Sequence, residues 1–348
     1  MAPKTMLAAI LVEQKKPLVI DQVELPQTLS VGQVLVKIVY SGICGSQLGE
    51  IDGAKGPDKF LPHLLGHEGS GEVLEIGPGI TRVKPHDHVV LHWMKGAGIE
   101  AKPPVYTWKN QPCNAGWVTT FQEYAIVSEN RLTTIPHDFD LKTAALFGCA
   151  VTTGLGVIVN NAKLTIGESV AVFGAGGVGL NQIQGANLVS AYPIIAIDVH
   201  DNRLELARSL GATHTINSKH VNASEKIREI AGIAGVDVAI DNTGIPEVIQ
   251  QCYELTKPQG RVVLVGVPKK GNTISIYSLP MHFGKKIIGS HGGETKPNED
   301  IIKYINAVKS ELFSVAPLIS REFTFMEINN AIEQMRNGSL SGRCVLSA

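Results

Sequence analysis

The segment Ser169-Val170-Ala171-Val172-Phe173-Gly174-Ala175-Gly176-Gly177-Val178-Gly179 decides the fold of this chain. Its first five residues form a short apolar run, as a fully buried strand of a parallel sheet requires. Residues 180–190 predict a helix. A strand that leads into a helix through the spacing G-x-G-x-x-G predicts a site for a dinucleotide pyrophosphate, because the helix N-terminus presents N–H groups and a positive dipole to the phosphates.

The glycines and a downstream acid strengthen this interpretation. Gly174 permits a tight turn, Gly176 lets the backbone approach the phosphates, and Gly179 allows close packing of helix and strand. A second apolar strand, residues 193–197, ends in Asp198, nineteen residues after Gly179 and close to the ~20 expected of an acid that binds the adenosine ribose. A carboxylate there would repel a 2′-phosphate, which favours NAD over NADP. The alternative is a glycine-rich turn in another βαβ unit.

Strand and helix signals alternate from about residue 151 to 290, which predicts a parallel, doubly wound Rossmann domain. Residues 1–150 instead carry short strands between Gly and Pro turns and predict a β-rich, partly open barrel. Residues 291–348 form a C-terminal segment with two helical patterns. The expected strands of the middle region are 170–173, 194–197, 236–241 and 262–267, and its expected helices include 202–210 and 246–255; the C-terminal helices are 298–311 and 326–337.

Three scattered residues have the chemistry of metal ligands. Cys44 lies in a Gly-rich turn after an apolar strand, His67 is framed by glycines, and Cys149 follows much later. Two thiolates and one imidazole would leave one position open on a tetrahedral zinc, as a catalytic site requires. Each residue also has a structural interpretation, because a lone Cys is commonly a small buried hydrophobe and a lone His is more often hydrogen bonded.

These residues match a known family over essentially the whole chain. The chain resembles the zinc-dependent alcohol dehydrogenases of the medium-chain dehydrogenase/reductase superfamily. The resemblance implies a GroES-like catalytic domain over 1–150, a Rossmann domain over 151–290, and a segment, 291–348, that returns to the catalytic domain. The matching stretches are Gly42-Ile43-Cys44-Gly45-Ser46, Gly66-His67-Glu68-Gly69-Ser70-Gly71, Phe147-Gly148-Cys149-Ala150-Val151-Thr152-Thr153-Gly154, the glycine motif, and Gly342-Arg343.

The resemblance assigns roles residue by residue. Cys44, His67 and Cys149 become the protein ligands of one catalytic zinc, and Glu68 an acid behind the zinc that either approaches it or never ligates. Ser46 becomes the hydroxyl that takes the alcohol proton. The implied cofactor-binding residues are Gly174, Gly176, Gly177, Val178, Gly179, Asp198, Arg203, Thr153, Val267 and Arg343. Thr153 and Val178 would pack on the nicotinamide, Arg343 would reach the pyrophosphate, and Arg203 would contact the ribose or remain a solvated helix cation.

The chain departs from the family pattern at three places. Gln47 stands where many relatives have an acid that hydrogen bonds the histidine ligand, so the imidazole would be less basic. Gly49 stands where several relatives have a relay histidine. Residues 94–108 replace a lobe that in many relatives carries four cysteines around a structural zinc, and Cys113 alone cannot build such a site. We therefore expect a single zinc per chain.

The replaced segment is also where we expect substrate specificity. Leu91, His92 and Trp93 occupy positions where relatives place pocket residues, and a Trp face suits an apolar or sugar-like surface. The alternative is that Trp93 fills a local core. Cys149 favours the alcohol branch over polyol relatives, which tend to have a glutamate there. Residues 272–277 alternate polar and β-branched residues, and in this family such an outer strand can pair with a second subunit.

Composition excludes several classes. A net charge of -1 over 348 residues argues against nucleic acid or an anionic membrane as a partner. The 5 cysteines are scattered and suggest buried thiols in a reducing compartment. The N-terminus lacks the apolar region of a signal peptide, and the longest apolar stretch, residues 144–159, is too short to span a bilayer. A cytoplasmic enzyme with a small-molecule substrate is expected, as a homodimer or homotetramer.

The sequence therefore predicts an oxidoreductase that moves a hydride reversibly from a primary or secondary alcohol to NAD. A zinc ion held by two thiolates remains a Lewis acid and makes an alcohol more acidic. Two alternatives stay open. One is a zinc-free quinone or enone reductase on the same scaffold. The other is a catalytically idle relative that binds dinucleotide.

Overall fold

The computed structural model describes residues 3–348, which form two compact units. Unit 1 runs up to Cys149 and also includes Lys296–Ser339 and Arg343–Ala348. Unit 2 consists of Ala150–Thr295 and Leu340–Gly342. The chain thus leaves unit 1 close to residue 150, where the sequence changes from Gly- and Pro-rich turns to alternating strands and helices.

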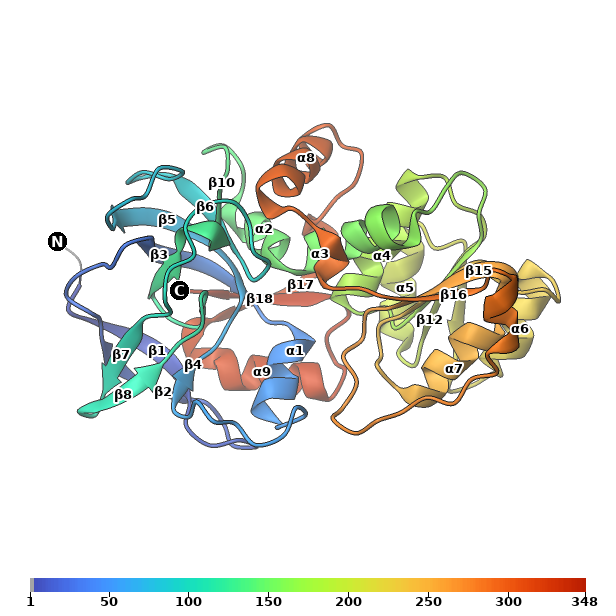
Figure 1. Cartoon of the computed structure of the whole chain (residues 1–348), viewed down its shortest axis with the longest axis horizontal. Coiled ribbons are helices and arrows are strands. Elements are labelled where there is room, and N and C mark those ends of the chain that lie inside the picture. The colour runs from blue at the N-terminus through green and yellow to red at the C-terminus, as the bar shows by residue number, and fades with distance from the viewer. Residues whose placement is uncertain (1–2) are drawn as a thin grey trace. The chain divides into compact units, whose positions relative to one another are not determined.

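Five strands of unit 1 close into a small barrel in the order β1-β2-β7-β8-β4 (Figure 1). The predicted barrel was partly open, but antiparallel pairing of β1 with β4 closes it. Met6, Ile10, Tyr106 and Cys113 pack in its core. The barrel strands are β1 (Thr5–Leu11), β2 (Val19–Glu24), β4 (His63–Leu64), β7 (Val105–Trp108) and β8 (Gln111–Asn114).

A seven-stranded sheet forms the rest of the β-structure of unit 1. Its order is β10-β6-β5-β3-β18-β17, with β9 also paired to β3. This pairing places β18, from the end of the chain, beside β3. The strands are β3 (Gln33–Gly42), β5 (Glu68–Ile76), β6 (His88–His92), β9 (Tyr124–Ser128), β10 (Leu132–Thr134), β17 (Ile319–Thr324) and β18 (Arg343–Ser347).

The helices of unit 1 are mostly short, and α2 starts at a clear capping signal. The Asp140 side chain accepts hydrogen bonds from the N–H groups of Lys142 and Thr143 at the start of α2. The helices are α1 (Gly45–Ile51), α2 (Leu141–Ala145), α8 (Pro297–Lys309) and α9 (Ile328–Arg336), with 3₁₀ turns η1 (Glu129–Arg131), η2 (Leu146–Gly148), η6 (Ala316–Leu318) and η7 (Phe325–Glu327).

Unit 2 contains a six-stranded parallel sheet in the order β13-β12-β11-β14-β15-β16. This is the doubly wound arrangement that the strand and helix alternation predicted, and it confirms the fold class. Helix α4 packs against β11 and β12, α5 against β12 and β13, and α7 against β14 and β15. The strands are β11 (Val170–Phe173), β12 (Ile194–Asp198), β13 (His214–Asn217), β14 (Val236–Asp241), β15 (Thr256–Leu264) and β16 (Lys286–Gly289).

The helical segments of unit 2 include the predicted helix after the glycine motif. It begins at Gly177, three residues earlier than the sequence suggested, so the last glycines of the motif lie inside its first turn. The segments are α3 (Ala150–Gly156), η3 (Val157–Ala162), α4 (Gly177–Leu188), α5 (Asp201–Ser209), α6 (Ala223–Ala231), α7 (Pro246–Glu254), η4 (Leu279–Phe283) and η5 (Gly292–Glu294).

The two strand predictions at the outer edge of unit 2 have different outcomes. Residues 272–277 form no strand within the single chain, in which β16 takes the edge position next to β15 and pairs in parallel with Arg261–Leu264. Pairing of 272–277 with a second subunit stays a prediction. In addition, β15 begins at Thr256 and ends at Leu264, so Val267 follows the strand instead of ending it.

Candidate functional site

Three turns of unit 1 carry the predicted metal ligands. Cys44 caps α1 just after β3, His67 lies directly before β5, and Cys149 follows the η2 turn. The residue before His67 has to be glycine, since Gly66 has a φ of +91° and a Cβ there would clash with the Thr120 hydroxyl. Residues that are far apart in the sequence are therefore brought together by the ends of separate strands and turns.

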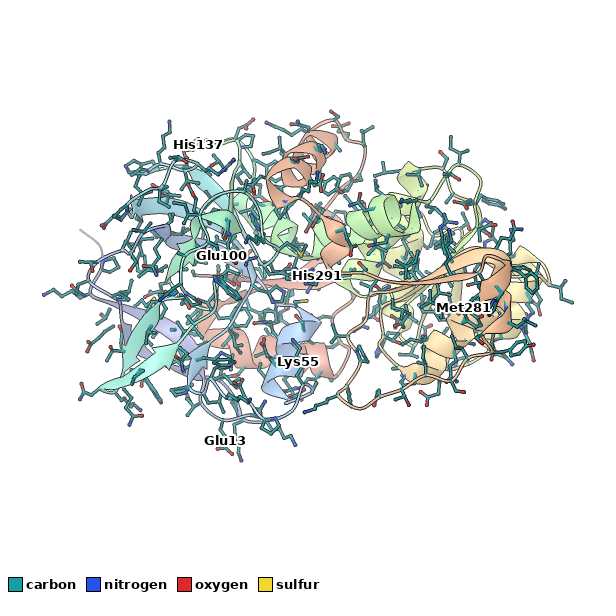
Figure 2. All side chains as sticks on the ribbon, in the orientation of Figure 1. Glu13, Lys55, Glu100, His137, Met281 and His291 are labelled. Atoms are coloured by element: carbon teal, nitrogen blue, oxygen red, sulfur yellow. The ribbon has the colours of Figure 1, made fainter. Side chains whose placement is uncertain are left out.

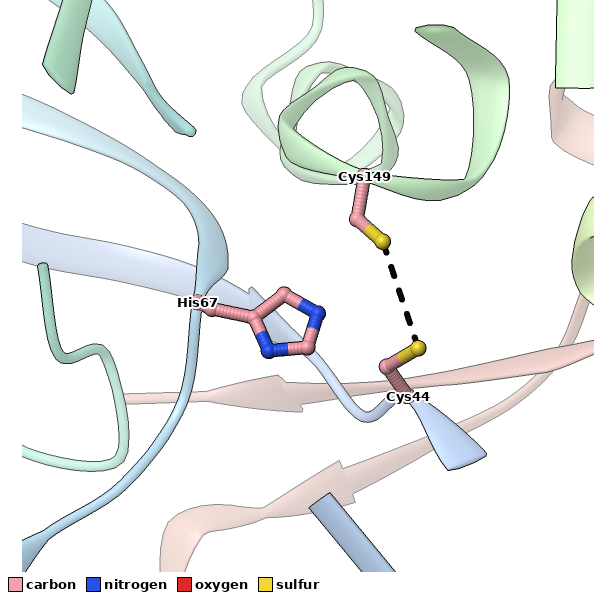
Figure 3. A group of neighbouring side chains, drawn as sticks. All are labelled: Cys44, His67 and Cys149. Carbon is pink, nitrogen blue, oxygen red and sulfur yellow. Dashed lines mark hydrogen bonds between the residues drawn. The ribbon is translucent and has the colours of Figure 1, made fainter. Parts of the chain in front are cut away.

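The three side chains converge, as Figure 3 shows. Their ligand atoms all lie within 4.8 Å of one another, and the two sulfurs are 3.9 Å apart. Two thiolates at ~2.3 Å from a tetrahedral zinc lie about 3.8 Å apart, so the observed spacing matches that of a zinc site. Within residues 3–348 this is the one group of three or more Cys, His, Asp or Glu side chains with such geometry.

Without a metal, the electrostatics of the three residues favour a thiolate at one of the two cysteines. The pKa of Cys44 lies well below its ordinary value because the Cys149 thiol donates a hydrogen bond to it, and Arg343 and His67 add positive charge. The same hydrogen bond, together with burial, raises the pKa of Cys149. Burial lowers the pKa of His67, but the Cys44 thiolate outweighs this and raises it overall.

Glu68 and Arg343 form a buried ion pair next to the thiols. Arg343 Nη1 lies 3.2 Å from Glu68 Oε1 and donates to the Ile43 carbonyl at 2.7 Å, while Nη2 donates to Cys44 Sγ at 3.6 Å. Gly42 leaves the room for Glu68, because a Cβ at residue 42 would approach its carboxyl group to 2.8 Å. Burial lowers the pKa of Arg343, but the charge of Glu68 and the cysteines raises it overall, so the guanidinium stays charged.

Ser46 and Gln47 follow Cys44 on the first turn of α1. Ser46 is exposed, and its hydroxyl makes no hydrogen bond to any other residue of the range 3–348, which leaves it free for a substrate. Gln47 is buried and lies 2.9 Å from His67 Nδ1 through its amide nitrogen. The predicted contact between residue 47 and the imidazole is therefore present, with an amide in place of an acid.

The two predicted pocket residues have different surroundings. His92 is 1% exposed, donates through Nδ1 to the Met94 carbonyl at 2.8 Å, and has Nε2 3.0 Å from the Thr133 hydroxyl. Burial lowers the pKa of His92 to about 4, so the ring is neutral. Both of its nitrogens are engaged inside unit 1. Trp93 is half-buried and packs partly against the core of the seven-stranded sheet, which matches the local-core alternative.

The glycine loop of unit 2 has the shape that a pyrophosphate needs. Gly174 has a φ of +90°, and a Cβ at Gly179 would clash with the Gly174 carbonyl oxygen. At Gly176 a Cβ would meet no atom within 4 Å, so open space lies above the backbone at the start of α4. Gly177 and Val178 form the first turn of this helix. The loop thus offers N–H groups and room for an anion.

The predicted ribose acid lies beside the same loop. Asp198 Oδ2 accepts from Ala175 N at 2.8 Å, and Oδ1 accepts from the N–H groups of Val199 and His200 at 2.7 and 3.0 Å. Arg203 Nη1 is 3.8 Å from Asp198 Oδ2. The structure therefore brings the predicted acid and base together at the end of β12.

Two further predicted cofactor residues lie in unit 2. The Thr153 hydroxyl is buried without a hydrogen-bond partner among the described residues, which marks a place for a ligand to complete. Val267 is 66% exposed, as a residue that covers a cofactor in the loaded protein would be.

Two protein-family models match parts of this chain. Residues 30–137 match the family model of the alcohol dehydrogenase GroES-like domain, and residues 177–310 match that of the zinc-binding dehydrogenase. The S-(hydroxymethyl)glutathione dehydrogenase of Synechocystis sp. is 32% identical, with 95% of this chain and 96% of the relative covered. The chain belongs to the zinc-dependent alcohol dehydrogenase family. This family is part of the medium-chain dehydrogenase/reductase superfamily and binds zinc and NAD.

Other relatives agree with this assignment. Alcohol dehydrogenase 1 of Trifolium repens is 31% identical over 97% of this chain and 96% of its own length. The crystal structure of benzyl alcohol dehydrogenase from Acinetobacter calcoaceticus superposes with a TM-score of 0.89 at 28% identity, with 99% of each chain covered. The recognition of the family, its fold and its activity as a zinc-dependent alcohol oxidoreductase are thereby confirmed.

In this family member the segment that replaces the cysteine-rich lobe is held by hydrogen bonds. Glu129 accepts from the N–H groups of Thr81, Arg82 and Ile99. Arg131 donates to the Trp93 carbonyl at 2.7 Å and pairs with Glu100, which is labelled in Figure 2. Cys113 lies in the barrel core, where it pairs across the strands with Tyr106 at the end of this segment. The sequence alone did not reveal the role of Glu129.

A second unpredicted feature supports the glycine loop. Gln182 on α4 and Asn242 after β14 exchange two amide hydrogen bonds of 2.8 Å, and the Asn242 amide also donates to the carbonyls of Phe173 and Gly174. Gln182 is fully buried. The available signal was an amide side chain on the first turns of a helix that follows a glycine motif, where an apolar residue is usual.

No single helix among residues 3–348 is long and apolar enough to cross a membrane; one bent pair, Leu141–Gly148 with Ala150–Ala162, passes on length and composition alone.

Proposed function

We propose that this chain is an NAD-dependent alcohol dehydrogenase that oxidises a primary or secondary alcohol reversibly to an aldehyde or ketone, with one zinc ion held by Cys44, His67 and Cys149. The observation that carries the proposal is the convergence of two thiols and one imidazole at a sulfur spacing of 3.9 Å. Three protein ligands leave one position for the substrate oxygen, as in catalytic zinc sites. When bound, zinc supplies a Lewis acid and NAD the hydride acceptor.

The residues around the ligands control charge and protons. The exposed Ser46 hydroxyl, two residues after Cys44, accepts the proton that the alcohol gives up and passes it toward solvent. Arg343 keeps Cys44 in its thiolate form by charge and by a hydrogen bond. Glu68 holds Arg343 in place through their buried ion pair and lies behind the ligands.

The cofactor residues of unit 2 select NAD. The loop at Gly176 receives the pyrophosphate, and the Asp198 carboxylate binds the ribose hydroxyls and repels a 2′-phosphate. Arg203 stays next to Asp198 and contacts the ribose. Unit 1 thus acts as the catalytic domain and unit 2 as the dinucleotide domain. The remaining cofactor contacts of the proposal are Thr153, Gly174, Gly177, Val178, Gly179, Val267 and Arg343.

The proposal includes one zinc per chain and a homo-oligomer. The single zinc is supported by the absence of a second Cys, His, Asp or Glu cluster within residues 3–348. The oligomer, a dimer or tetramer, is supported by exposed apolar side chains on the segment that follows β15, namely Tyr277, Leu279, Met281 and Phe283. Self-association would cover these side chains.

The names of the relatives suggest where to look for the substrate. They are called S-(hydroxymethyl)glutathione dehydrogenase and benzyl alcohol dehydrogenase. We propose a panel that includes both of these alcohols together with simple aliphatic primary and secondary alcohols. His92 has its ring nitrogens engaged, so it would shape a pocket as a neutral wall, and Trp93 would offer its indole face.

The test measures zinc and turnover on one sample. Elemental analysis of protein purified without chelator is expected to give one zinc per chain, and nicotinamide absorbance should report NAD-linked turnover with the alcohol panel. Cys44→Ser is expected to lose both zinc and at least about 10²-fold in kcat, since it removes a metal ligand. Cys113→Ser is the matched control, because Cys113 is a buried thiol of the same unit outside the triad.

The outcomes separate the alternatives. Zinc-free protein on repeated preparation, with NADPH-linked reduction of a conjugated carbonyl, would replace the proposal with a zinc-free reductase. Binding of NAD without turnover of any alcohol or aldehyde would replace it with an idle dinucleotide-binding protein. Turnover that survives Cys44→Ser with unchanged metal content would refute the zinc assignment.

A further inference from the structure

Gln47 contacts three groups around the histidine ligand. Its carbonyl oxygen Oε1 accepts a hydrogen bond from Gly66 N. Its amide nitrogen Nε2 donates to Glu50 Oε2 at 3.0 Å and lies 2.9 Å from His67 Nδ1. The side chain is only 5% exposed, so water does not compete freely for these positions. All four residues belong to unit 1.

Two of these contacts fix which way the amide points. The backbone N–H of Gly66 is a donor only, and the Glu50 carboxylate is an acceptor only. The amide oxygen must therefore face Gly66, and the amide NH₂ must face Glu50. If the amide were flipped, its NH₂ would face the N–H donor of Gly66, and its oxygen would face the carboxylate of Glu50, which is an acceptor. As a result, an N–H group of Gln47 is directed at His67 Nδ1.

This orientation opposes the state of His67 that holds a metal. Nδ1 faces Gln47, and the other ring nitrogen, Nε2, points toward the two sulfurs (Figure 3). A neutral imidazole that gives the Nε2 lone pair to zinc carries its proton on Nδ1 and is a donor there. Two donors then face each other at 2.9 Å. A carboxylate at residue 47 would accept from both Gly66 N–H and Nδ1–H.

We infer that Gln47 and Glu50 form a positioning pair. Compared with a carboxylate at position 47, this pair weakens the binding of zinc by His67 and makes zinc exchange faster. Glu50 acts through Gln47, since it keeps the amide NH₂ turned toward the imidazole. In the metal-free protein the tautomer with its proton on Nε2 accepts the amide hydrogen at Nδ1, which the zinc-bound ring cannot do. The pair therefore stabilises the metal-free state relative to the loaded state. The inference rests on the proposed zinc site at Cys44, His67 and Cys149.

An exchange of the two side chains tests this without a change of charge. In Gln47→Glu/Glu50→Gln the new carboxylate at 47 accepts from Gly66 N–H, from His67 Nδ1–H and from the new amide at 50, so every contact is satisfied in the loaded protein. The control is Gln22→Glu/Glu24→Gln, the same exchange at two exposed positions of β2 in the same unit. Both variants keep the composition and net charge of the wild type.

The main readout is the rate at which zinc passes to a chromogenic chelator. Changes in the partner of a ligating histidine alter metal affinity by roughly 10–100-fold, so zinc release from the Gln47/Glu50 exchange variant is expected to be about 10-fold slower or more. The control exchange should release zinc at the wild-type rate. The second readout is the melting temperature with and without zinc. Zinc should raise the melting temperature more in the Gln47/Glu50 variant than in the wild type, whereas a merely structural effect would shift loaded and metal-free protein alike.

A cobalt-substituted sample shows whether the ligands are unchanged. The thiolate charge-transfer and ligand-field bands of the variant should match those of the wild type, because the same three residues bind the metal. Zinc release that is as fast as in the wild type, or faster, from a variant that loads one zinc would overturn the inference and leave the proposed function intact. If the wild-type protein binds no zinc at the triad, the proposed function itself fails, and this result is seen before any variant is made.

Discussion

Glu129 offers a direct test of how the chain stabilises the segment that replaces the cysteine-rich lobe. Its carboxylate accepts from Thr81 N and Arg82 N through Oε1, at 2.8 and 2.9 Å, and from Ile99 N through Oε2, at 2.8 Å. It thereby joins the turn at residues 81–82 to the lobe segment. The perturbation is Glu129→Gln, which keeps the shape of the side chain and removes one acceptor.

The magnitude follows from the three contacts. A hydrogen bond to a charged group contributes about 1.5–3 kcal/mol. The amide oxygen of the variant can keep Thr81 and Arg82, but the amide NH₂ then faces the N–H of Ile99. One charge-assisted bond is lost and two are weakened, which amounts to roughly 2–4 kcal/mol. For a unit of this size we expect a fall of about 4–16 °C in melting temperature.

The pH dependence has a definite sign. Burial raises the pKa of Glu129, but the three backbone N–H donors and Arg82 lower it overall, below its ordinary value. A carboxyl group whose pKa is lower in the folded state stabilises the fold above its unfolded pKa of ~4.3, and this contribution is lost as the pH falls through the folded pKa. The difference in melting temperature between wild type and Glu129→Gln should therefore be full at pH 7 and shrink below about pH 4.

The assay is differential scanning calorimetry of metal-free protein at pH 7 and pH 3, with hydrogen exchange of the peptide that contains Ile99. Metal-free protein is used so that loss of zinc in acid does not contribute. Glu75→Gln is the control, since Glu75 is an exposed carboxylate on β5 of the same unit and makes no ion pair with any residue of 3–348. An equal difference at both pH values, or unchanged exchange at Ile99, would refute the reasoning.

Two further predictions concern the cofactor. Asp198→Gly removes the carboxylate at the end of β12 and should raise kcat/KM with NADP relative to NAD by about 10-fold or more, measured with one alcohol substrate; no shift would exclude Asp198 from the ribose site. Asn242→Ala removes the amide pair with Gln182 beneath the glycine loop and should raise the Kd for NAD about 3–10-fold in calorimetric titration, while zinc content stays unchanged. An unaltered Kd would show that the loop holds its shape without Asn242.

Local sequence patterns were sufficient to predict the doubly wound sheet. The apolar runs at 170–173 and 236–241 are strands with the predicted bounds, because buried parallel strands have a composition that helices between them do not share. The segment 272–277 has an equally clear pattern and forms no strand within the single chain. Pairing depends on which segment occupies the edge beside β15, and periodicity carries no information about neighbours.

The candidate site, like the fold, could be predicted from the sequence only in part. Residue type and family resemblance singled out Cys44, His67 and Cys149, and the structure brings them together. The contact of Gln47 with Glu50, one turn further along α1, was not predicted, because it depends on the position of Gly66 in another turn. The pairing of Glu68 with Arg343 joins residues at opposite ends of the chain and rests on the pairing of β18 with β3.

The charges in the site explain why the metal ligands and the neighbouring residues Gln47 and Glu50 can change independently of each other. Glu68 and Arg343 neutralise each other, so two thiolates would leave an uncompensated charge of -2 in a buried site. The raised pKa of Cys149 shows the response of the protein without a metal, which is to keep a proton on one sulfur. A divalent ion cancels the charge of both thiolates. The ligand set therefore fixes which ion fits, whereas Gln47 and Glu50, which add no charge at the sulfurs, adjust only how firmly His67 holds it.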